Sequence, residues 1–149
     1  MSDICVAVLV EKNLGASPED AWEVVGDFNG WANWHPVVKM SVADGHHVGA
    51  IRILVLADGR RISDRLLAYD EAAMTYSYVV ATEPNPLPVA DYRATITVVP
   101  LVSGCSVRWD ATFNTDETSA QSARKSFIVL FSQGLDRLED LLSTKLQKS

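Results

Sequence analysis

The feature that most constrains the fold is a long amphipathic segment near the C-terminal end of the chain. Apolar residues and one glycine recur there at helical spacing, at Phe127, Leu130, Phe131, Gly134, Leu135, Leu138, Leu141 and Leu142. Thr118 and Gln121 have the spacing of a capping box, so we predict one helix over residues 118–145. At about 1.5 Å per residue, such a helix is about 40 Å long and can cross a whole sheet.

Most of the remaining chain has the pattern of β-strands. An apolar run predicts a first strand over residues 4–12, and the sequence Ser17-Pro18-Glu19-Asp20 is typical of the start of a short helix, expected over residues 18–27. A further helical turn is expected around residues 30–34. Period-two alternation then predicts strands near residues 37–43, 49–57, 60–69, 73–82, 90–100 and 104–113.

The connections between these strands decide the topology. Tight turns are predicted at Asp58-Gly59, Asp70-Glu71 and Ser103-Gly104, whereas the prolines of residues 83–88 predict a stiff loop. Strands joined in this way form an antiparallel meander, so the fold class is α+β, with a seven-stranded curved sheet and the long helix on its concave face. We expect a single domain, 1–149. A straight helix fills a curved sheet poorly, which predicts a cavity between them.

Composition excludes several classes of function. The net charge of −6 opposes nucleic-acid binding, which depends on phosphate neutralisation. A hydrophobic content of 48% is too high for a disordered chain. No apolar run reaches membrane length, and the first residues lack the basic region of a signal peptide. We therefore expect no stable membrane insertion, a cytoplasmic location, and a monomer or homodimer.

The sequence gives little support for redox, metal or cofactor chemistry. Cys5 and Cys105 lie in strand-like runs and are expected to be inert core thiols. His46 and His47 are adjacent, but no third ligand has a suitable spacing, so no metal site is predicted. The sequence contains neither a nucleophile elbow nor a phosphate-binding glycine loop, and we expect no cofactor.

Aromatic residues are concentrated in the segment 27–38 (DFNGWANWHPVV), which also contains structure-breaking Gly30 and Pro36. Aromatic side chains at this density are expected to line either a core edge or the mouth of a cavity. We place Trp31, Trp34 and His35 at the entrance. A lone histidine is more often structural, but within a cavity mouth His35 is the candidate general base.

Charged residues alternate with apolar ones on two neighbouring strands. Arg52 shares a face with Leu54 and Leu56, and Asp64 shares a face with apolar residues of the next strand. Both charges are therefore predicted to be buried together, either as a structural ion pair or as part of a binding site. Four further residues have matching parity and are candidates to ring the cavity: Tyr76, Tyr78, Tyr92 and Trp109.

Several motifs resemble those of the START/Bet v 1-like (SRPBCC) superfamily: residues 21–28 (AWEVVGDF), Trp31, 34–36 (WHP), 64–67 (DRLL), 88–92 (PVADY) and 107–109 (VRW). More narrowly, the chain is similar to its bacterial polyketide cyclase/dehydrase-like members. The resemblance covers essentially the whole chain and implies the helix-grip fold. It also implies that the first strand pairs with the last, with Cys5 and Cys105 too far apart for a disulfide.

A weaker resemblance is to the plant abscisic acid receptors. It implies that Lys39 meets a ligand carboxylate and that Asp64 and Tyr92 lie in the pocket. The receptors' gate is replaced here by the turn at residues 57–60, and their latch by Leu87-Pro88. The resemblance therefore implies a pocket without gated hormone signalling. Apart from it, Lys39 is a solvated strand residue by default.

We predict that the protein binds a hydrophobic or amphipathic small molecule, such as a lipid, polyketide or aromatic acid, between its sheet and its C-terminal helix. Lys39, Arg52 and Asp64 would contact a polar head. The remaining predicted ligand-binding residues are Trp31, Trp34, Leu54, Leu56, Tyr76, Tyr78, Tyr92, Trp109, Phe127, Leu130 and Gly134. The alternatives are a polyketide cyclase or dehydratase, with catalytic candidates His35, Asp64 and Tyr92, and a protein-interaction module.

Overall fold

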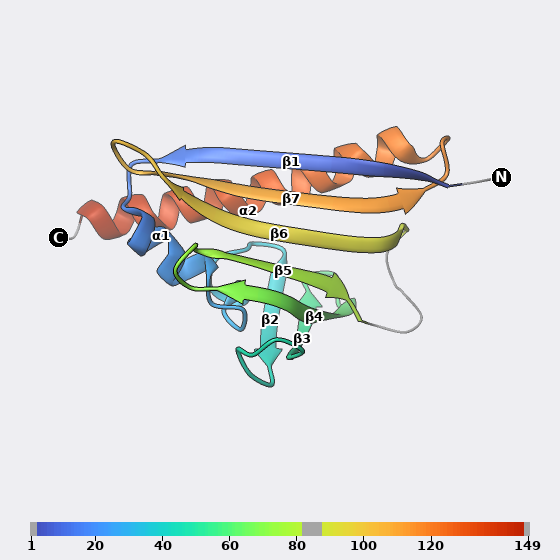
Figure 1. The fold of residues 1–149 in the computed structure, drawn as a ribbon, viewed down its shortest axis with the longest axis horizontal. Helices are drawn as coiled ribbons and strands as arrows, with labels where there is room; N and C mark the ends of the chain where they lie inside the picture. Colours follow the sequence, from blue (N-terminus) through green and yellow to red (C-terminus); the bar gives the residue numbers. More distant parts are fainter. Residues whose placement is uncertain (1–2, 82–87, 148–149) are drawn as a thin grey trace.

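The computed structural model describes residues 3–81 and 88–147, and it contains one sheet, two helices and a short 3-10 turn. Figure 1 shows these elements. In chain order they are β1 (Ile4–Leu14), α1 (Pro18–Val25), the 3-10 turn η1 (Trp31–Asn33), β2 (Val38–Ala43), β3 (Ile51–Leu56), β4 (Arg61–Asp70), β5 (Thr75–Val80), β6 (Ala90–Pro100), β7 (Cys105–Thr115) and α2 (Ala120–Gln147).

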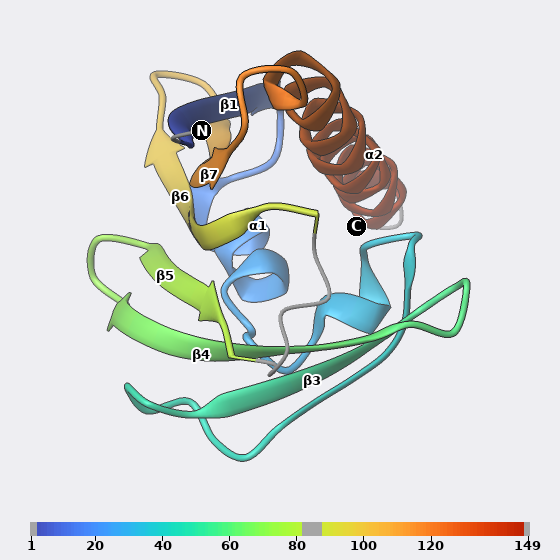
Figure 2. The ribbon, with the colours of Figure 1, turned by 90° about the vertical axis from the view of Figure 1, so that its right-hand side faces the viewer.

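The sheet has seven strands in the order β1-β7-β6-β5-β4-β3-β2, and every neighbouring pair is antiparallel. Figure 2 shows a curved sheet with α2 beside β1 and β7 on its open side, and with β3 and β4 at the far end of the curve. The predicted α+β class, the seven-stranded curved sheet and the long C-terminal helix are confirmed. Because β1 pairs with β7, the first strand and the strand before α2 hold the two ends of the fold together.

Helix boundaries follow from local capping. The Ser17 side chain accepts the backbone N–H of Asp20, and Pro18 occupies the first turn of α1, as predicted. α2 begins at Ala120, later than predicted. The Asp116 carboxylate accepts both the backbone N–H and the hydroxyl of Ser119 and closes the turn just before the helix. Thr118 lies within this turn and not next to the first helical residue, so the predicted Thr118–Gln121 capping box is wrong.

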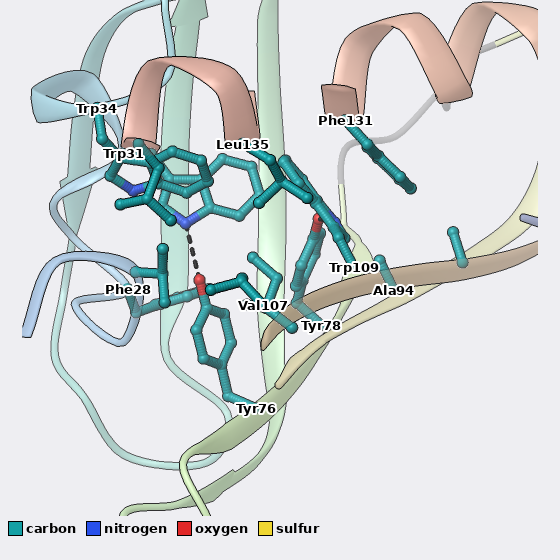
Figure 3. Packing of buried hydrophobic residues seen from close by; sticks show 14 of the residues in the cluster. Phe28, Trp31, Trp34, Tyr76, Tyr78, Ala94, Val107, Trp109, Phe131 and Leu135 are labelled. Atoms are coloured by element: carbon teal, nitrogen blue, oxygen red, sulfur yellow. Dashed lines mark hydrogen bonds between the residues drawn. The ribbon is translucent and has the colours of Figure 1, made fainter. Parts of the chain in front are cut away.

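The core is built on aromatic side chains from the η1 segment, the inner face of the sheet and α2 (Figure 3). Trp31 donates its indole N–H to the Tyr76 hydroxyl at 2.8 Å. Trp109 stacks on Phe131 of α2, with ring centroids 4.2 Å apart and planes within 10°. These contacts join the loop before β2, the middle of the sheet and the long helix into one packed unit.

The two cysteines lie at opposite ends of the β1–β7 ladder, since Cys5 pairs with Asn114 and Leu14 pairs with Cys105. Both thiols are free, as expected. Cys105 is buried, and burial raises the pKa of its thiol. Cys5 is exposed, so the prediction of an inert core thiol is wrong for this residue. It lies on the outer face of β1, between the inward-facing positions of that strand.

Among the described residues, no helix combines the length and the apolar character needed to span a bilayer.

Candidate ligand cavity

A cavity of about 530 Å³ lies between the inner face of the sheet and α2. Its wall is mostly apolar and aromatic, with a few polar groups. It is lined by Trp31, His35, Val37, Val38, Leu54, Leu56, Arg60, Ile62, Asp64, Tyr78, Val80, Pro88, Tyr92, Trp109, Ser119, Ser122, Ala123, Ser126, Phe127, Leu130 and Phe131. Its size and lining are typical of small-molecule pockets.

Ten of the residues predicted from the sequence line this cavity: Trp31, His35, Leu54, Leu56, Asp64, Tyr78, Tyr92, Trp109, Phe127 and Leu130. Five others do not: Trp34, Lys39, Arg52, Tyr76 and Gly134. Of the stiff loop predicted over residues 83–88, residues 83–87 fall outside the described part of the chain. Pro88 lies at the cavity wall.

Lys39 is exposed, and the prediction that it meets a ligand inside the cavity is wrong. Val38 faces inward, so alternation along β2 turns its neighbour Lys39 outward, as expected for a solvated strand residue. The register of β2 against β3 shifts between Val38 and Met40, and Met40 is exposed as well. The ligand contact of Lys39 is implied only by the resemblance to the plant receptors.

Trp34, Tyr76 and Gly134 are buried but do not line the cavity. Tyr76 is covered by Trp22 and Phe28 and by its hydrogen bond with Trp31. A Cβ at Gly134 would lie 2.6 Å from His35 Cδ2 and 3.0 Å from Trp34 Cζ3. Gly134 therefore permits close contact between α2 and the aromatic loop, and it leaves no gap beneath the pocket.

Arg52 and Asp64 form the predicted buried pair. They face each other across β3 and β4, and Arg52 Nη2 donates to Asp64 Oδ2 at 2.6 Å. Arg52 Nη1 donates to the Phe28 carbonyl, and its guanidinium lies over the rings of Phe28 and Trp31, 4.2 and 3.8 Å from their centroids. Arg52 is fully buried behind the wall, so Asp64 alone of this pair reaches the cavity.

Asp64 and the two tyrosines near it have raised pKa values. Burial raises the pKa of Asp64, and the Arg52 guanidinium opposes that rise. The pKa values of Tyr78 and Tyr92 are also raised, mainly by burial, so both phenols stay protonated at neutral pH. Tyr78 accepts a hydrogen bond from Trp109 Nε1 at 3.2 Å. One carboxylate and two neutral phenols therefore share this end of the cavity.

His35 is held in place by both of its ring nitrogens. Nδ1 accepts the backbone N–H of Val37 at 3.1 Å, and Nε2 lies 3.1 Å from the Leu130 carbonyl, to which it donates. Burial lowers the pKa of His35 to about 4, so the ring is neutral at physiological pH. With both nitrogens engaged, the geometry favours a structural role linking the aromatic loop to α2 over the predicted role as general base.

Sequence reasoning missed eleven lining residues: Val37, Val38, Arg60, Ile62, Val80, Pro88, Ser119, Ser122, Ala123, Ser126 and Phe131. Val38, Ile62 and Val80 are apolar strand positions, and alternation alone does not show which part of a strand borders the cavity. No role was predicted for the three serines. Ser122 and Ser126 are four residues apart on α2, with Ser119 just before the helix, and this spacing, which places them on one side, is the signal that could have found them.

Comparison with known proteins agrees with this architecture. A family model described as polyketide cyclase/dehydrase and lipid transport matches residues 6–143. The chain belongs to this family. No curated protein sequence matches it significantly. The description of the polyketide cyclase/dehydrase and lipid transport family covers both catalysts and carriers. Membership therefore does not distinguish catalysis from binding, and only the residues of the cavity bear on that question.

Solved structures with this fold come from bacteria and plants. An uncharacterised protein from Bacillus thuringiensis is 25% identical, with a TM-score of 0.83 over 92% of this chain and 98% of its own. A Thermobifida fusca protein is 28% identical, with a TM-score of 0.82 over 93% of each chain. Norcoclaurine synthase from Thalictrum flavum is 17% identical, with a TM-score of 0.75 over 95% of each chain, and shares the fold alone.

Among the described residues, no group of three or more His, Cys, Asp and Glu side chains is arranged to hold a metal ion.

Proposed function

We propose that this protein binds a hydrophobic or amphipathic small molecule in the cavity between its sheet and α2. The observation that carries the proposal is the cavity itself, which has a volume of about 530 Å³ and is walled by aromatic and aliphatic side chains of the sheet and α2. Burying an apolar guest there gains about 25 cal/mol for each Å² of apolar surface removed from water. The aromatic rings favour a flat or ring-bearing guest.

Two further facts support this proposal. The family description includes lipid transport. Norcoclaurine synthase, which has the same fold, has been solved in complex with dopamine and hydroxybenzaldehyde. We propose that the cavity of this protein also accepts small aromatic molecules.

The test combines native mass spectrometry of the purified protein with calorimetric titration of small apolar compounds. We expect a co-purified small molecule, or a stabilising guest that raises the melting temperature. Ala123→Phe introduces a ring at the cavity wall and should weaken binding at least about tenfold, since the guest and the ring compete for the same space.

Gln121→Phe is the matched control, because residue 121 is exposed on the same helix and lies outside the cavity lining. It should bind guests like the unmodified protein. Equal affinity of Ala123→Phe and Gln121→Phe, or the absence of any stabilising guest, would contradict the proposal.

The second candidate function is a cyclase or dehydratase, supported by the carboxylate of Asp64 beside the phenols of Tyr78 and Tyr92. A buried carboxylate with a raised pKa can accept a proton from carbon, and a neutral phenol can donate a hydrogen bond to an enolate oxygen. Incubation with a linear poly-β-carbonyl substrate and chromatography of the products distinguishes the two functions. A binding protein returns its guest unchanged.

The cytoplasmic location, the single-domain organisation and the monomeric or homodimeric state stay predictions. Size-exclusion chromatography with light scattering tests the oligomeric state.

A further inference from the structure

We propose that the cavity selects guests whose polar group donates a hydrogen bond, such as phenols and alcohols, and discriminates against carboxylates. This inference rests on the proposed function and specifies the chemical class of its ligand. It replaces the expectation of an aromatic acid with a neutral donor. The side chain responsible is Asp64, with Arg52 behind it.

Only one member of the Arg52–Asp64 ion pair can be reached from the cavity. Arg52 is 0% exposed and absent from the cavity wall, whereas Asp64 lines it. The guanidinium donates to Asp64 Oδ2 and to the Phe28 carbonyl, and it is enclosed by the rings of Phe28, Trp31 and Tyr78. A guest therefore meets the carboxylate and not the cation that neutralises it.

The second step is the unused hydrogen-bonding capacity of that carboxylate. Oδ2 accepts from Arg52 at 2.6 Å, and no hydrogen bond from the described residues reaches the other oxygen, Oδ1. An ionised carboxylate accepts hydrogen bonds through both oxygens, and bonds to a charged acceptor are stronger than bonds between neutral groups. A guest hydroxyl is suited to supply the missing donor.

The third step concerns the other polar groups at the wall. Tyr78 and Tyr92 are neutral phenols, and His35 is neutral with both nitrogens engaged. Arg60 is the cation among the described lining residues, and it is exposed and paired with Asp58 at the β3–β4 turn. A guest carboxylate near Asp64 would therefore face a like charge at low dielectric without a free cation beside it.

The test uses three naphthalene probes that share a ring system. 2-Naphthol is a neutral donor, 2-methoxynaphthalene has no donor, and 2-naphthoate is an anion at neutral pH. Calorimetric titration should give the tightest binding for 2-naphthol, with the ether at least about tenfold weaker because the bond to the carboxylate is lost. The naphthoate should bind more weakly still.

Variants test whether Asp64 causes this order. The double variant R52M/D64L replaces the ion pair with apolar side chains, a change that buried pairs often tolerate. It should bind the ether and 2-naphthol with affinities within about threefold of each other. Arg65→Met, on the outer face of the same strand, is the matched control and should keep the original order.

The outcomes separate the two proposals. If no probe binds and no other guest stabilises the protein, the proposed function itself fails. If the probes bind but the naphthoate is as tight as the naphthol, or the ether equals the naphthol, ligand binding stands and the selectivity inference is overturned. An unchanged probe order in R52M/D64L also overturns it, since another group would then be responsible.

Discussion

Single residues fix how closely α2 approaches the aromatic loop. His35 donates to the Leu130 carbonyl, and Gly134, one turn further along α2, leaves room for the imidazole. The glycine lowers helix stability by about 1 kcal/mol relative to alanine when only the helix is considered. The packing of His35 and Trp34 against the helix backbone, which only a glycine allows here, offsets this loss of helix stability.

Gly134→Ala should therefore destabilise the protein although alanine is the better helix former. The added Cβ would lie 2.6 Å from His35 Cδ2, which forces the loop or the helix to move. We expect the free energy of unfolding to fall by about 1–3 kcal/mol in urea titrations. Gln133→Ala, at the exposed neighbouring position, is the control and should change it little. A stabilised Gly134→Ala variant would show that the contact is loose.

His35 should also make stability depend on pH. Its pKa is lowered from 6.5 to about 4 by burial, so the unfolded chain binds a proton in that interval while the folded protein does not. Stability due to the neutral ring is present above pH 6.5 and is lost as the pH falls towards 4, by up to about 3 kcal/mol. Urea unfolding of the unmodified protein and of His35→Gln at pH 6.5 and at pH 4 measures this loss of stability, which should be smaller in the variant. Parallel pH curves would refute this role.

At the scale of elements, the β3–β4 hairpin brings together the charged side chains of Arg52 and Asp64. Alternation along both strands predicted that Arg52 and Asp64 share the inner face, and the structure confirms it. On β2, Lys39 lies outside next to the inward-facing Val38, so the resemblance to the plant receptors, and not the alternation, was wrong about it. Alternation could not separate Tyr78, at the cavity wall, from Tyr76, because the cover that Phe28 and Trp22 give Tyr76 depends on how α1 and the loop after it pack.

The two partners of the pair should respond differently to substitution. Asp64→Asn leaves a buried guanidinium that cannot lose its charge, and we expect a loss of about 3–5 kcal/mol. Arg52→Met leaves a carboxylate that can take up a proton, so its loss should be smaller. With the cation removed, burial raises the folded-state pKa of Asp64 further, so stability is gained as the pH falls and is lost as it rises through that pKa.

Thermal unfolding of both variants at pH 7 and pH 5 measures this asymmetry. The melting temperature of Arg52→Met should move towards that of the unmodified protein at the lower pH, and that of Asp64→Asn should not. Recovery of both variants, or of neither, would contradict this assignment of the charges.

At the scale of the whole molecule, the cavity separates two halves that are otherwise joined through the sheet. α2 lies beside β1 and β7, and Figure 2 shows β3 and β4 on the far side of the curve. The wall nevertheless combines residues from both halves, such as Leu54 and Asp64 from the hairpin and Phe127 and Leu130 from α2. The order of elements in the sequence predicted this arrangement, but the volume left between them depends on side-chain packing that no pattern specifies.

A bound guest should therefore protect both halves at once. At a free concentration of 100 times its Kd, a guest adds about 2.7 kcal/mol to the free energy of unfolding. Hydrogen exchange followed by mass spectrometry should show slower exchange in β3, β4 and α2 together, with little change in the β1–β7 ladder. Protection confined to α2 would indicate that the guest binds on the helix surface.

The distribution of indole rings gives the protein an optical readout of its own. Trp31 and Trp109 lie at the cavity wall, whereas Trp22 packs against Tyr69 away from it. A guest touching Trp31 and Trp109 alters the polarity around them and quenches or shifts their emission, while the environment of Trp22 stays unchanged. Occupancy could thus be followed by intrinsic fluorescence, without attaching a dye.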